Sequence, residues 1–207
     1  QDGSAGGEGP QRWADPTTWT FTRNPVVMIE NILRGVALPD GQTYGGGWTE
    51  RRLPAAMWMQ AMNECDVEVE QDTDAGTVMV PKYQAGFEVK IGTPDIGGDE
   101  PAAVLEELLK SCGAEIADVG GTMHIAVDAR MPSMFITDGD ILRSKPQELD
   151  AFPPLQETFN GVHATYPDPA NDWRAKEAPP RYDLEAEALD GRRLIADLDL
   201  PAVTSGR

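Results

Sequence analysis

The strongest structural signal in this chain is a helical apolar pattern that passes directly into two short strands. Pro101 suits a first helical position, and up to Gly113 apolar side chains repeat at helical spacing, namely Val104, Leu105, Leu108, Leu109 and Cys112. The run AEIADVGGTMHIAVD then places a strand-like stretch on either side of Gly120 and Gly121, which is typical of a hairpin. The chain is therefore predicted to contain an α-β-β unit, whose last strand carries on one side Met123, Ile125 and Val127.

Two further helices are expected before this unit. The run RNPVVMIENILRG has Asn24 as a candidate N-cap, Pro25 at the first helical position and Gly35 at a left-handed stop. The run LPAAMWMQAMNEC puts Ala55, Met59 and Met62 on one face, which we interpret as core packing rather than a methionine-rich partner groove. Helices are thus predicted near 25–34, 54–65 and 101–112. The loop between the first two, LPDGQTYGGGW, lacks the Lys-Ser/Thr pair of a phosphate loop and is expected to be a flexible surface loop.

The remaining pattern indicates short strands. Strand character appears at 18–22 (TWTFT), 78–80, 87–91 and 159–166. The last run, YDLEAEALDGRRLIADLDL, predicts an antiparallel hairpin with a three-residue loop over 189–191. That loop pairs Leu184 with Ala196 and Ala186 with Leu194, so both apolar rows lie on one side of the sheet. Gly191 then takes the positive φ that the loop requires.

These elements predict an α+β fold, with about three helices packed on short antiparallel sheets and a mainly β C-terminal part. Residues 1–12 are Gly-rich and polar and are expected to form a flexible linker. An α+β domain is predicted over 13–132 and the mainly β part, with its terminal hairpin, over 133–207. The break is placed near 131–135. The chain begins without Met and stops just after a strand-like run, so we expect a piece of a longer polypeptide.

Charge narrows the classes of partner. The 207 residues include 17 basic and 35 acidic side chains, for a net charge of -18. Such a chain repels phosphate backbones and anionic lipid, so a direct nucleic-acid site or membrane-surface binding is not expected. No apolar run approaches the ~20 residues of a membrane helix. Cys65 and Cys112 form no CxxC pair, and we expect reduced, buried thiols; a disulfide between them is the alternative.

The acidic side chains do not fall into a calcium-loop pattern. A calcium loop needs a Gly at the sixth and a Glu at the twelfth position. A frame that starts at Asp72 reaches Tyr83 at the twelfth position, and one that starts at Asp168 reaches Trp173 at the sixth. In ITDGDIL, the two acids Asp138 and Asp140 flank a Gly, which more often makes a turn. Calcium held by mixed backbone and carboxylate oxygens is the minor alternative.

Catalytic patterns are also missing from the sequence. His124 and His163 lie in expected strands, and spacing places no Ser, Cys or acid beside either. Glu106 and Glu107 point in different directions on a helix and do not form a catalytic pair. We therefore assign no catalytic, cofactor-binding or metal residues and no cofactor. The residues indicate a binding or assembly module and not an enzyme.

The stretch FNGVHATYPDPANDW is predicted to be a strand that ends in a stiff corner. Pro167 and Pro169 cannot donate to a strand ladder, and each holds the residue before it in extended geometry. Asn171 and Asp172 can close turns with their side chains, which leaves Trp173 free to fold back on apolar neighbours. A corner is favoured over a metal site.

The order of these motifs resembles the tail-tip and baseplate-hub proteins of phages, which include the host-specificity proteins of long-tailed phages and the large hub protein of gene transfer agents. The resemblance runs from about Trp13 to the C-terminus. It begins with NPVVMIENILRG and continues through PAAMWMQAMNECDVEV and AAVLEELLKSCGAEIADVGGTMHIAVD. It is strongest in ETFNGVHATYPDPANDWRAKEAPPRYDLEAEALDGRRLIADLDLPAVTS, where an FN-V strand, an NDW corner and a DG hairpin follow one another.

The resemblance implies a non-catalytic structural and assembly module of the virion. Proteins of this kind close the distal end of the tail tube, usually as trimers, among other tail proteins. It further implies assembly in the bacterial cytoplasm, and contact with a cell-surface receptor through domains missing from this sequence. It supplies no catalytic residues for these positions. Acidic side chains would suit a conduit to which DNA must not adhere.

Two other classes of function remain open. A carbohydrate- or receptor-binding module would use exposed indoles as stacking surfaces, and it requires two or more of them in one open groove; the candidates are Trp13, Trp19, Trp48, Trp58 and Trp173. A hydrolase fragment would require a cleft with converging acids of shifted pKa. Burial of the indoles would count against the first class.

Overall fold

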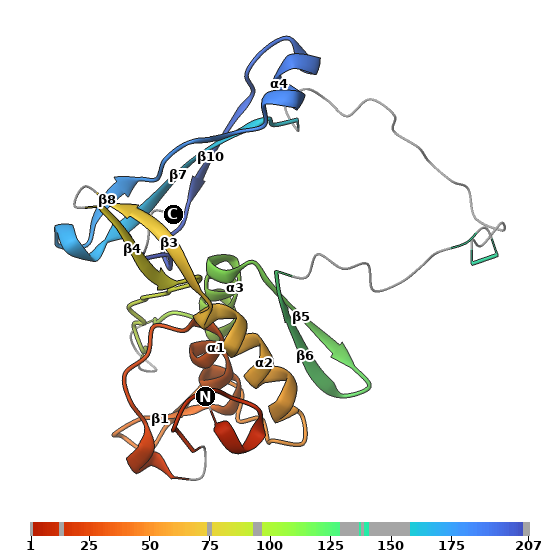
Figure 1. Cartoon of the computed structure of the whole chain (residues 1–207). Coiled ribbons are helices and arrows are strands. Elements are labelled where there is room, and N and C mark those ends of the chain that lie inside the picture. The colour runs from red at the N-terminus through yellow and green to blue at the C-terminus, as the bar shows by residue number, and fades with distance from the viewer. Residues whose placement is uncertain are drawn as a thin grey trace.

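The chain has an α+β architecture, as the sequence predicts. The structure is a computed structural model that describes residues 2–12, 15–73, 76–92, 97–128, 137, 139–140 and 158–204. A helical body carries small two-stranded antiparallel sheets, and the C-terminal sheet stands on it (Figure 1). The expected break at 131–135 lies outside the described residues, so the division of the chain into two parts stays a prediction.

Four α-helices lie in the described ranges: α1 Pro25–Arg34, α2 Ala55–Asp66, α3 Pro101–Cys112 and α4 Leu184–Asp190. The first three start and end within one residue of the predicted bounds. Asn24 caps α1, because its Oδ1 accepts from the backbone N–H groups of Val26 and Val27. Gly113 ends α3 with φ 57°, in the left-handed conformation that favours glycine.

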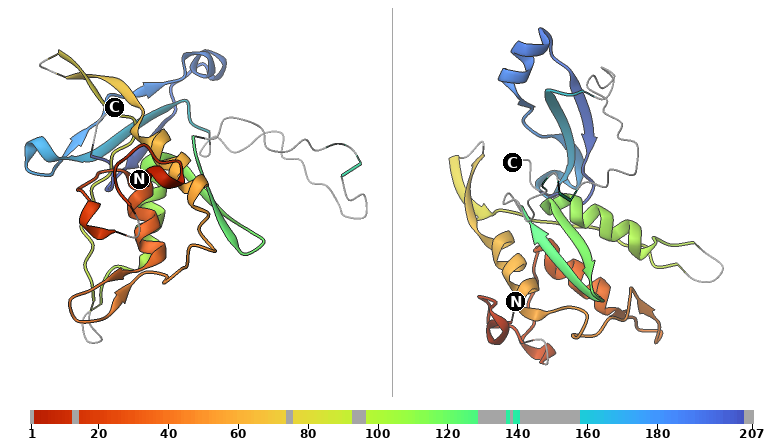
Figure 2. Two further views of the ribbon diagram at one scale, coloured as in Figure 1. Left: turned by 60° about the horizontal axis from the view of Figure 1, so that its bottom comes forward. Right: turned by 90° about the vertical axis from the view of Figure 1, so that its right-hand side faces the viewer.

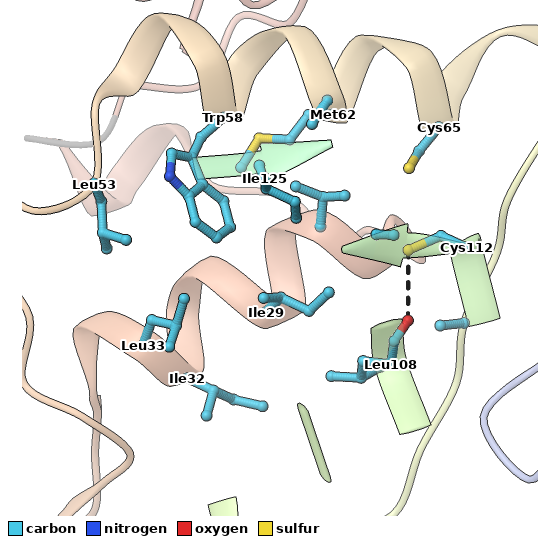
Figure 3. Packing of buried hydrophobic residues seen from close by; sticks show 14 of the residues in the cluster. Ile29, Ile32, Leu33, Leu53, Trp58, Met62, Cys65, Leu108, Cys112 and Ile125 are labelled. Atoms are coloured by element: carbon cyan, nitrogen blue, oxygen red, sulfur yellow. Dashed lines mark hydrogen bonds between the residues drawn. The ribbon is translucent and has the colours of Figure 1, made fainter. Parts of the chain in front are cut away.

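The three long helices share one apolar core (Figure 3). α1 packs against both α2 and α3. Met59 and Met62 of α2 are buried, which confirms the expected core packing of this face. Trp58 is buried beside them, and together they meet Ile29 of α1 and Leu108 of α3 in one cluster. Removing this apolar surface from water is the main force that holds the helical body together.

The ten described strands form four small sheets. Three are two-stranded and antiparallel: β1 Val36–Ala37 with β2 Thr43–Tyr44, β3 Glu68–Thr73 with β4 Gly76–Pro81, and β5 Ala114–Val119 with β6 Thr122–Val127. The fourth contains β7 Gly161–Asp168, β8 Arg174–Glu177, β9 Arg181–Tyr182 and β10 Ile195–Asp199. In that sheet β7 is central and pairs with the other three.

The hairpin after α3 is confirmed. β5 and β6 pair as Val119 with Thr122, and both turn glycines have positive φ, 64° at Gly120 and 86° at Gly121. Ile125 faces the core, and the Nε1 of Trp58 donates to the carbonyl of Met123 at 3.2 Å. The hairpin is thereby fixed against α2.

The predicted C-terminal hairpin is wrong. Residues 184–190 form α4, and β10 runs parallel to β7, with Ile195 beside Gly161. The run LEAEALD satisfies both a strand alternation and a helix, and Asp183 decides between them. Its side chain accepts from the N–H groups of Glu185 and Ala186 and caps the helix. Gly191 does have positive φ, 66°, but as the left-handed end of α4.

Several other local expectations differ from the structure. The strands predicted at 18–22 and 87–91 are not formed: Thr18 ends a short 3-10 helix, and residues 19–22 and 87–91 have no regular hydrogen-bonded structure. The Gly-rich loop is packed rather than free, because Gly46 N–H donates to Ile32 O and Trp48 N–H to Leu33 O at the end of α1. A Cβ on Gly45 would overlap the Ile32 carbonyl, so only glycine fits there.

The N-terminal segment, expected to be a flexible linker, contacts α2. Its short 3-10 helices are η1 Gly3–Ala5 and η2 Pro16–Thr18. Asn63 of α2 holds it at two points, since its Nδ2 donates to Gly6 O at 2.9 Å and its Oδ1 accepts from Glu8 N–H at 3.2 Å. A composition rich in Gly does not reveal such long-range partners.

The C-terminal sheet is joined to the helical body by main-chain contacts. Ala85 and Val203 form an antiparallel bridge, and Gly86 N–H donates to Ala202 O at 3.0 Å. Ala202 is 1% exposed and belongs to the core cluster. The right-hand view of Figure 2 accordingly shows the sheet at one end of the body.

Candidate functional site

One buried side chain organises the start of the C-terminal sheet. Asn160 is 3% exposed and stands just before β7. Its Nδ2 donates to Asp190 Oδ2 at 3.0 Å and to Arg192 O at 2.9 Å, and its Oδ1 accepts from Leu194 N–H at 2.7 Å. Its carbonyl accepts from Asp183 N–H at 2.8 Å. Asn160 therefore connects β7 to both ends of α4 and to the approach to β10, which explains the FN motif structurally.

The register of β7 and β10 gives the sheet two different faces. Paired residues share a face, and successive residues alternate. Val162 lies beside Ala196 and Ala164 beside Leu198, which together make what we call the apolar face: Val162, Ala164, Ala196 and Leu198. Val162 is 38% and Leu198 46% exposed. This face therefore presents apolar surface to solvent in the chain alone.

The opposite side, called here the polar face, consists of His163, Thr165, Glu177, Asp197 and Asp199. These residues, together with Ala164, Ala178, Pro180 and Leu198, line an open depression of about 460 Å³. His163 Nε2 lies 3.1 Å from Tyr182 Oη, and Thr165 Oγ1 donates to Asp199 Oδ1 at 3.0 Å. His163 Nδ1 is 3.9 Å from Asp197 Oδ1, at the limit of an ion pair. This arrangement suits contact with cations or basic side chains; it does not orient a nucleophile towards a base.

α4 carries further exposed apolar side chains. Leu184 is 70% and Leu189 88% exposed, and Phe159 nearby is 55% exposed. Figure 1 shows α4 at the end of the sheet that lies away from the helical body. Arg193 covers the ring of Tyr182 at 3.9 Å and donates to Glu187 at 2.9 Å, so this part of the segment is ordered by its own contacts.

β10 also leaves one edge open. It pairs with β7 along one side, and in the described ranges no strand pairs with its other side. An open edge presents unpaired N–H and C=O groups to which another chain can bind. We call the following group the candidate assembly surface: the open edge of β10, the apolar face, and the exposed side chains of Leu184 and Leu189.

The YPDPANDW stretch is a turn between two paired strands. Asp168 caps the 3-10 helix η4 Pro169–Asn171 by accepting from Ala170 N–H at 3.0 Å. Asp172 and Trp173 follow with positive φ, 53° and 59°. The strand was expected to end here, but β8 returns along β7, so the turn closes a hairpin. A turn therefore lies where the corner was expected, although β7 runs on through Pro167 to Asp168.

The tryptophans do not gather in one groove among the described residues. Trp58 is buried in the core, and Trp48 is covered by the guanidinium of Arg52 at 4.4 Å from the ring centre. Trp173 lies against Gly86 yet is 56% exposed. Trp19 is 49% exposed at the end of η2, and Trp13 lies outside the described residues. The requirement for two indoles in one groove is not met by the four described tryptophans.

Trp19 does line one cavity, of about 270 Å³, between the N-terminal segment and helices α1 and α2. Glu30 reaches it from α1, but its carboxylate is buried and pairs with Arg34 at 2.8 Å. The Oε1 of Gln11 is buried there without a hydrogen-bond partner. A polar atom of this kind is readily satisfied by water.

The other residues weighed from the sequence lie apart from one another. His124 lines a groove between α2 and β6, whereas His163 is on the C-terminal sheet. Glu107 pairs with Lys110 at 2.7 Å, and Glu106 is exposed. Asp140 accepts from the N–H and Oγ1 of Thr137, which lowers the pKa of its carboxyl and closes the expected turn. Asp138 lies outside the described residues.

Two negative findings apply to the described part of the chain. No set of three or more His, Cys, Asp or Glu side chains there is placed to hold a metal ion. Likewise, no helix in these ranges has both the length and the apolar character that crossing a bilayer demands.

Comparison with known families agrees with the sequence resemblance at a coarse level. A model of the phage tail protein family Phage-tail_3 matches residues 100–207, slightly more than half of the 207 residues. The chain belongs to this phage tail protein family. No curated protein matches the chain. The segment matched by Phage-tail_3 runs from α3 to the C-terminus, so the whole candidate assembly surface lies inside it.

A phage tail protein is a component of the virion and associates with other tail proteins. The sequence could indicate a phage tail protein because its motifs follow one another in the same order as in the tail proteins that it resembles. The candidate assembly surface itself was missed, because it depends on the parallel pairing of β10 with β7. The only available signal was the capping Asp183 before a run of good helix formers.

Proposed function

We propose that this phage tail protein is a structural and assembly module of a tail tip or baseplate hub. The observation that carries the proposal is the candidate assembly surface, which combines exposed Leu184 and Leu189 with an apolar sheet face and an open strand edge. Contiguous apolar surface on a soluble protein commonly marks a contact with another protein. Here exposed apolar side chains occur on a chain whose net charge is -18.

In this role the candidate assembly surface contacts neighbouring tail proteins. The particle contains the chain as a homotrimer at the tail tip, assembled in the bacterial cytoplasm before release. Contact with a receptor is made by segments that this sequence does not include. Identification of the particle that contains the chain would distinguish a phage from a gene transfer agent.

The module acts without catalysis in this proposal. Among the described acids, Asp66 is the one whose pKa is raised, by burial, and it lies in the helical body against Asn24. It therefore does not belong to a cleft of converging carboxylates, which the hydrolase alternative requires.

Mass spectrometry of purified tail-bearing particles tests the proposal. Peptides of this chain should be present at a few copies per particle, at a ratio to tube subunits that fits a three-fold tip. Cross-linking of intact particles should connect residues 184–199 to another tail protein. Particles that contain the other tail proteins but lack this chain would contradict the proposal and favour the carbohydrate- or receptor-binding alternative.

A further inference from the structure

The chain has two cysteines, and the fold brings them together in the core. Cys65 is next to last in α2 and Cys112 is the last residue of α3, and both are free and fully buried. The Cys112 thiol donates to the Leu108 carbonyl at 3.5 Å, and both cysteines belong to one cluster of buried core residues. Figure 3 shows the two side chains facing one another across the gap between the helices.

We propose that Cys65 and Cys112 form a disulfide when the protein passes from a reducing to an oxidising environment. The structure as described is the reduced state. Oxidation would join the end of α2 directly to the end of α3, whereas in the reduced state both helices are held through their packing on α1. Since the family match begins at residue 100, the bond would tie the matched part of the chain to the part before it.

The reaction is an ordinary thiol–disulfide exchange with a small-molecule disulfide as oxidant. One cysteine thiolate attacks the oxidant, which releases one small thiol and leaves a mixed disulfide. The second cysteine then attacks the protein sulfur of that mixed disulfide, forms the Cys65–Cys112 bond and releases the second small thiol. Two protein thiols are oxidised and one small disulfide is reduced to two thiols.

The environment of the thiols determines the rate. The contact with Cys112 and burial raise the pKa of Cys65 far above its ordinary value, whereas the contact with Cys65 lowers the pKa of Cys112, so Cys112 is the thiol that reacts first. A bulky oxidant reaches a buried sulfur only when the helix ends open locally. Oxidation should therefore be slow in the folded protein. Once the first sulfur has reacted, the second is already its neighbour, so the mixed disulfide should not accumulate.

The test treats the whole purified chain with oxidised glutathione and follows thiols and mass over time. Alkylation and intact mass spectrometry should show both thiols lost together, and peptide mapping should find a Cys65–Cys112 linkage in monomeric protein on non-reducing gels. The melting temperature of the oxidised protein should rise by several degrees and return when a reductant is added, because the bond restricts the unfolded chain.

Single variants provide the matched controls. Cys65→Ala and Cys112→Ala each keep one thiol and cannot form the internal bond. Oxidised glutathione should therefore not raise their melting temperatures, and their glutathione adducts should persist. If either variant fails to fold, the wild-type chain decides instead: its mixed disulfide with glutathione should be lost rapidly as the Cys65–Cys112 bond forms. Persistence of two free thiols under conditions that oxidise exposed thiols, or stable glutathione on both cysteines, would overturn the proposal.

Discussion

At the scale of single residues, two buried polar side chains hold together segments that are distant in sequence. Asn24 caps α1 and also donates to Met62 O and to Asp66 Oδ1 at the end of α2. Asn160 connects β7 to α4 and to the approach to β10 through its side-chain hydrogen bonds. The cap role of Asn24 was predictable because it is local. The role of Asn160 was not, because its partners lie about thirty positions further along the chain.

Replacing Asn160 should strongly destabilise the C-terminal sheet. Asn160→Ala leaves Leu194 N–H and Arg192 O without their partners, and we expect a loss of about 2–3 kcal/mol in the free energy of unfolding. Denaturant unfolding measures this loss. Asn171→Ala, at an exposed position in η4, is the matched control and should stay close to wild type. An equal effect of the two substitutions would contradict the role of Asn160 in connecting β7, α4 and the approach to β10.

The second prediction at this scale concerns pH. Burial raises the pKa of Asp66, so the folded state binds a proton more readily than the unfolded state and stability falls as pH rises above the ordinary pKa. Asp66→Asn removes this penalty and keeps an oxygen that can accept from Asn24. We expect a higher melting temperature than wild type at neutral pH, with the difference shrinking as pH falls towards about 4. The exposed Glu106→Gln should show no such trend; a constant difference at all pH values would contradict the assignment.

At the scale of elements, the sequence predicted what short-range patterns determine. α1, α2, α3 and the β5–β6 hairpin each combine a cap or turn residue with a consistent apolar period. Residues 184–190 fit two periods, and the strand interpretation was wrong there. The parallel pairing of β10 with β7 joins residues more than thirty positions apart, and no local pattern indicates it.

α4 should depend on its N-cap. Asp183→Ala removes the acceptor for two helical N–H groups and should destabilise this seven-residue helix by about 1 kcal/mol. Amide hydrogen exchange, followed residue by residue, should accelerate over 184–190 while the α1–α3 core remains protected. Asp197→Ala, on the polar face, removes a similar charge without a cap and is the control. Unchanged exchange in α4 would show that the cap does not stabilise it.

At the scale of the whole molecule, the candidate assembly surface lies away from the helical core, so its side chains can be changed without unfolding the chain. The double variant Leu184→Ser with Leu189→Ser should alter stability by no more than about 0.5 kcal/mol, because both side chains are exposed. Its incorporation into particles, measured by quantitative mass spectrometry, should fall severalfold if this surface binds a neighbouring tail protein. The control is Glu185→Ser in the same helix. Normal incorporation of the double variant would remove α4 from the proposed interface.

The junction between the helical body and the sheet has an evolutionary consequence. Backbone groups of Ala85, Gly86 and Ala202 make it, and the two alanines are almost fully buried. Since main-chain atoms are common to all residues, most nearby side chains can vary without separating the two halves. Gly86 is the exception, because a methyl group there would meet Trp173 and Thr204 at 2.8–3.2 Å. Homologous chains can thus diverge in both halves and still share one way of attaching them.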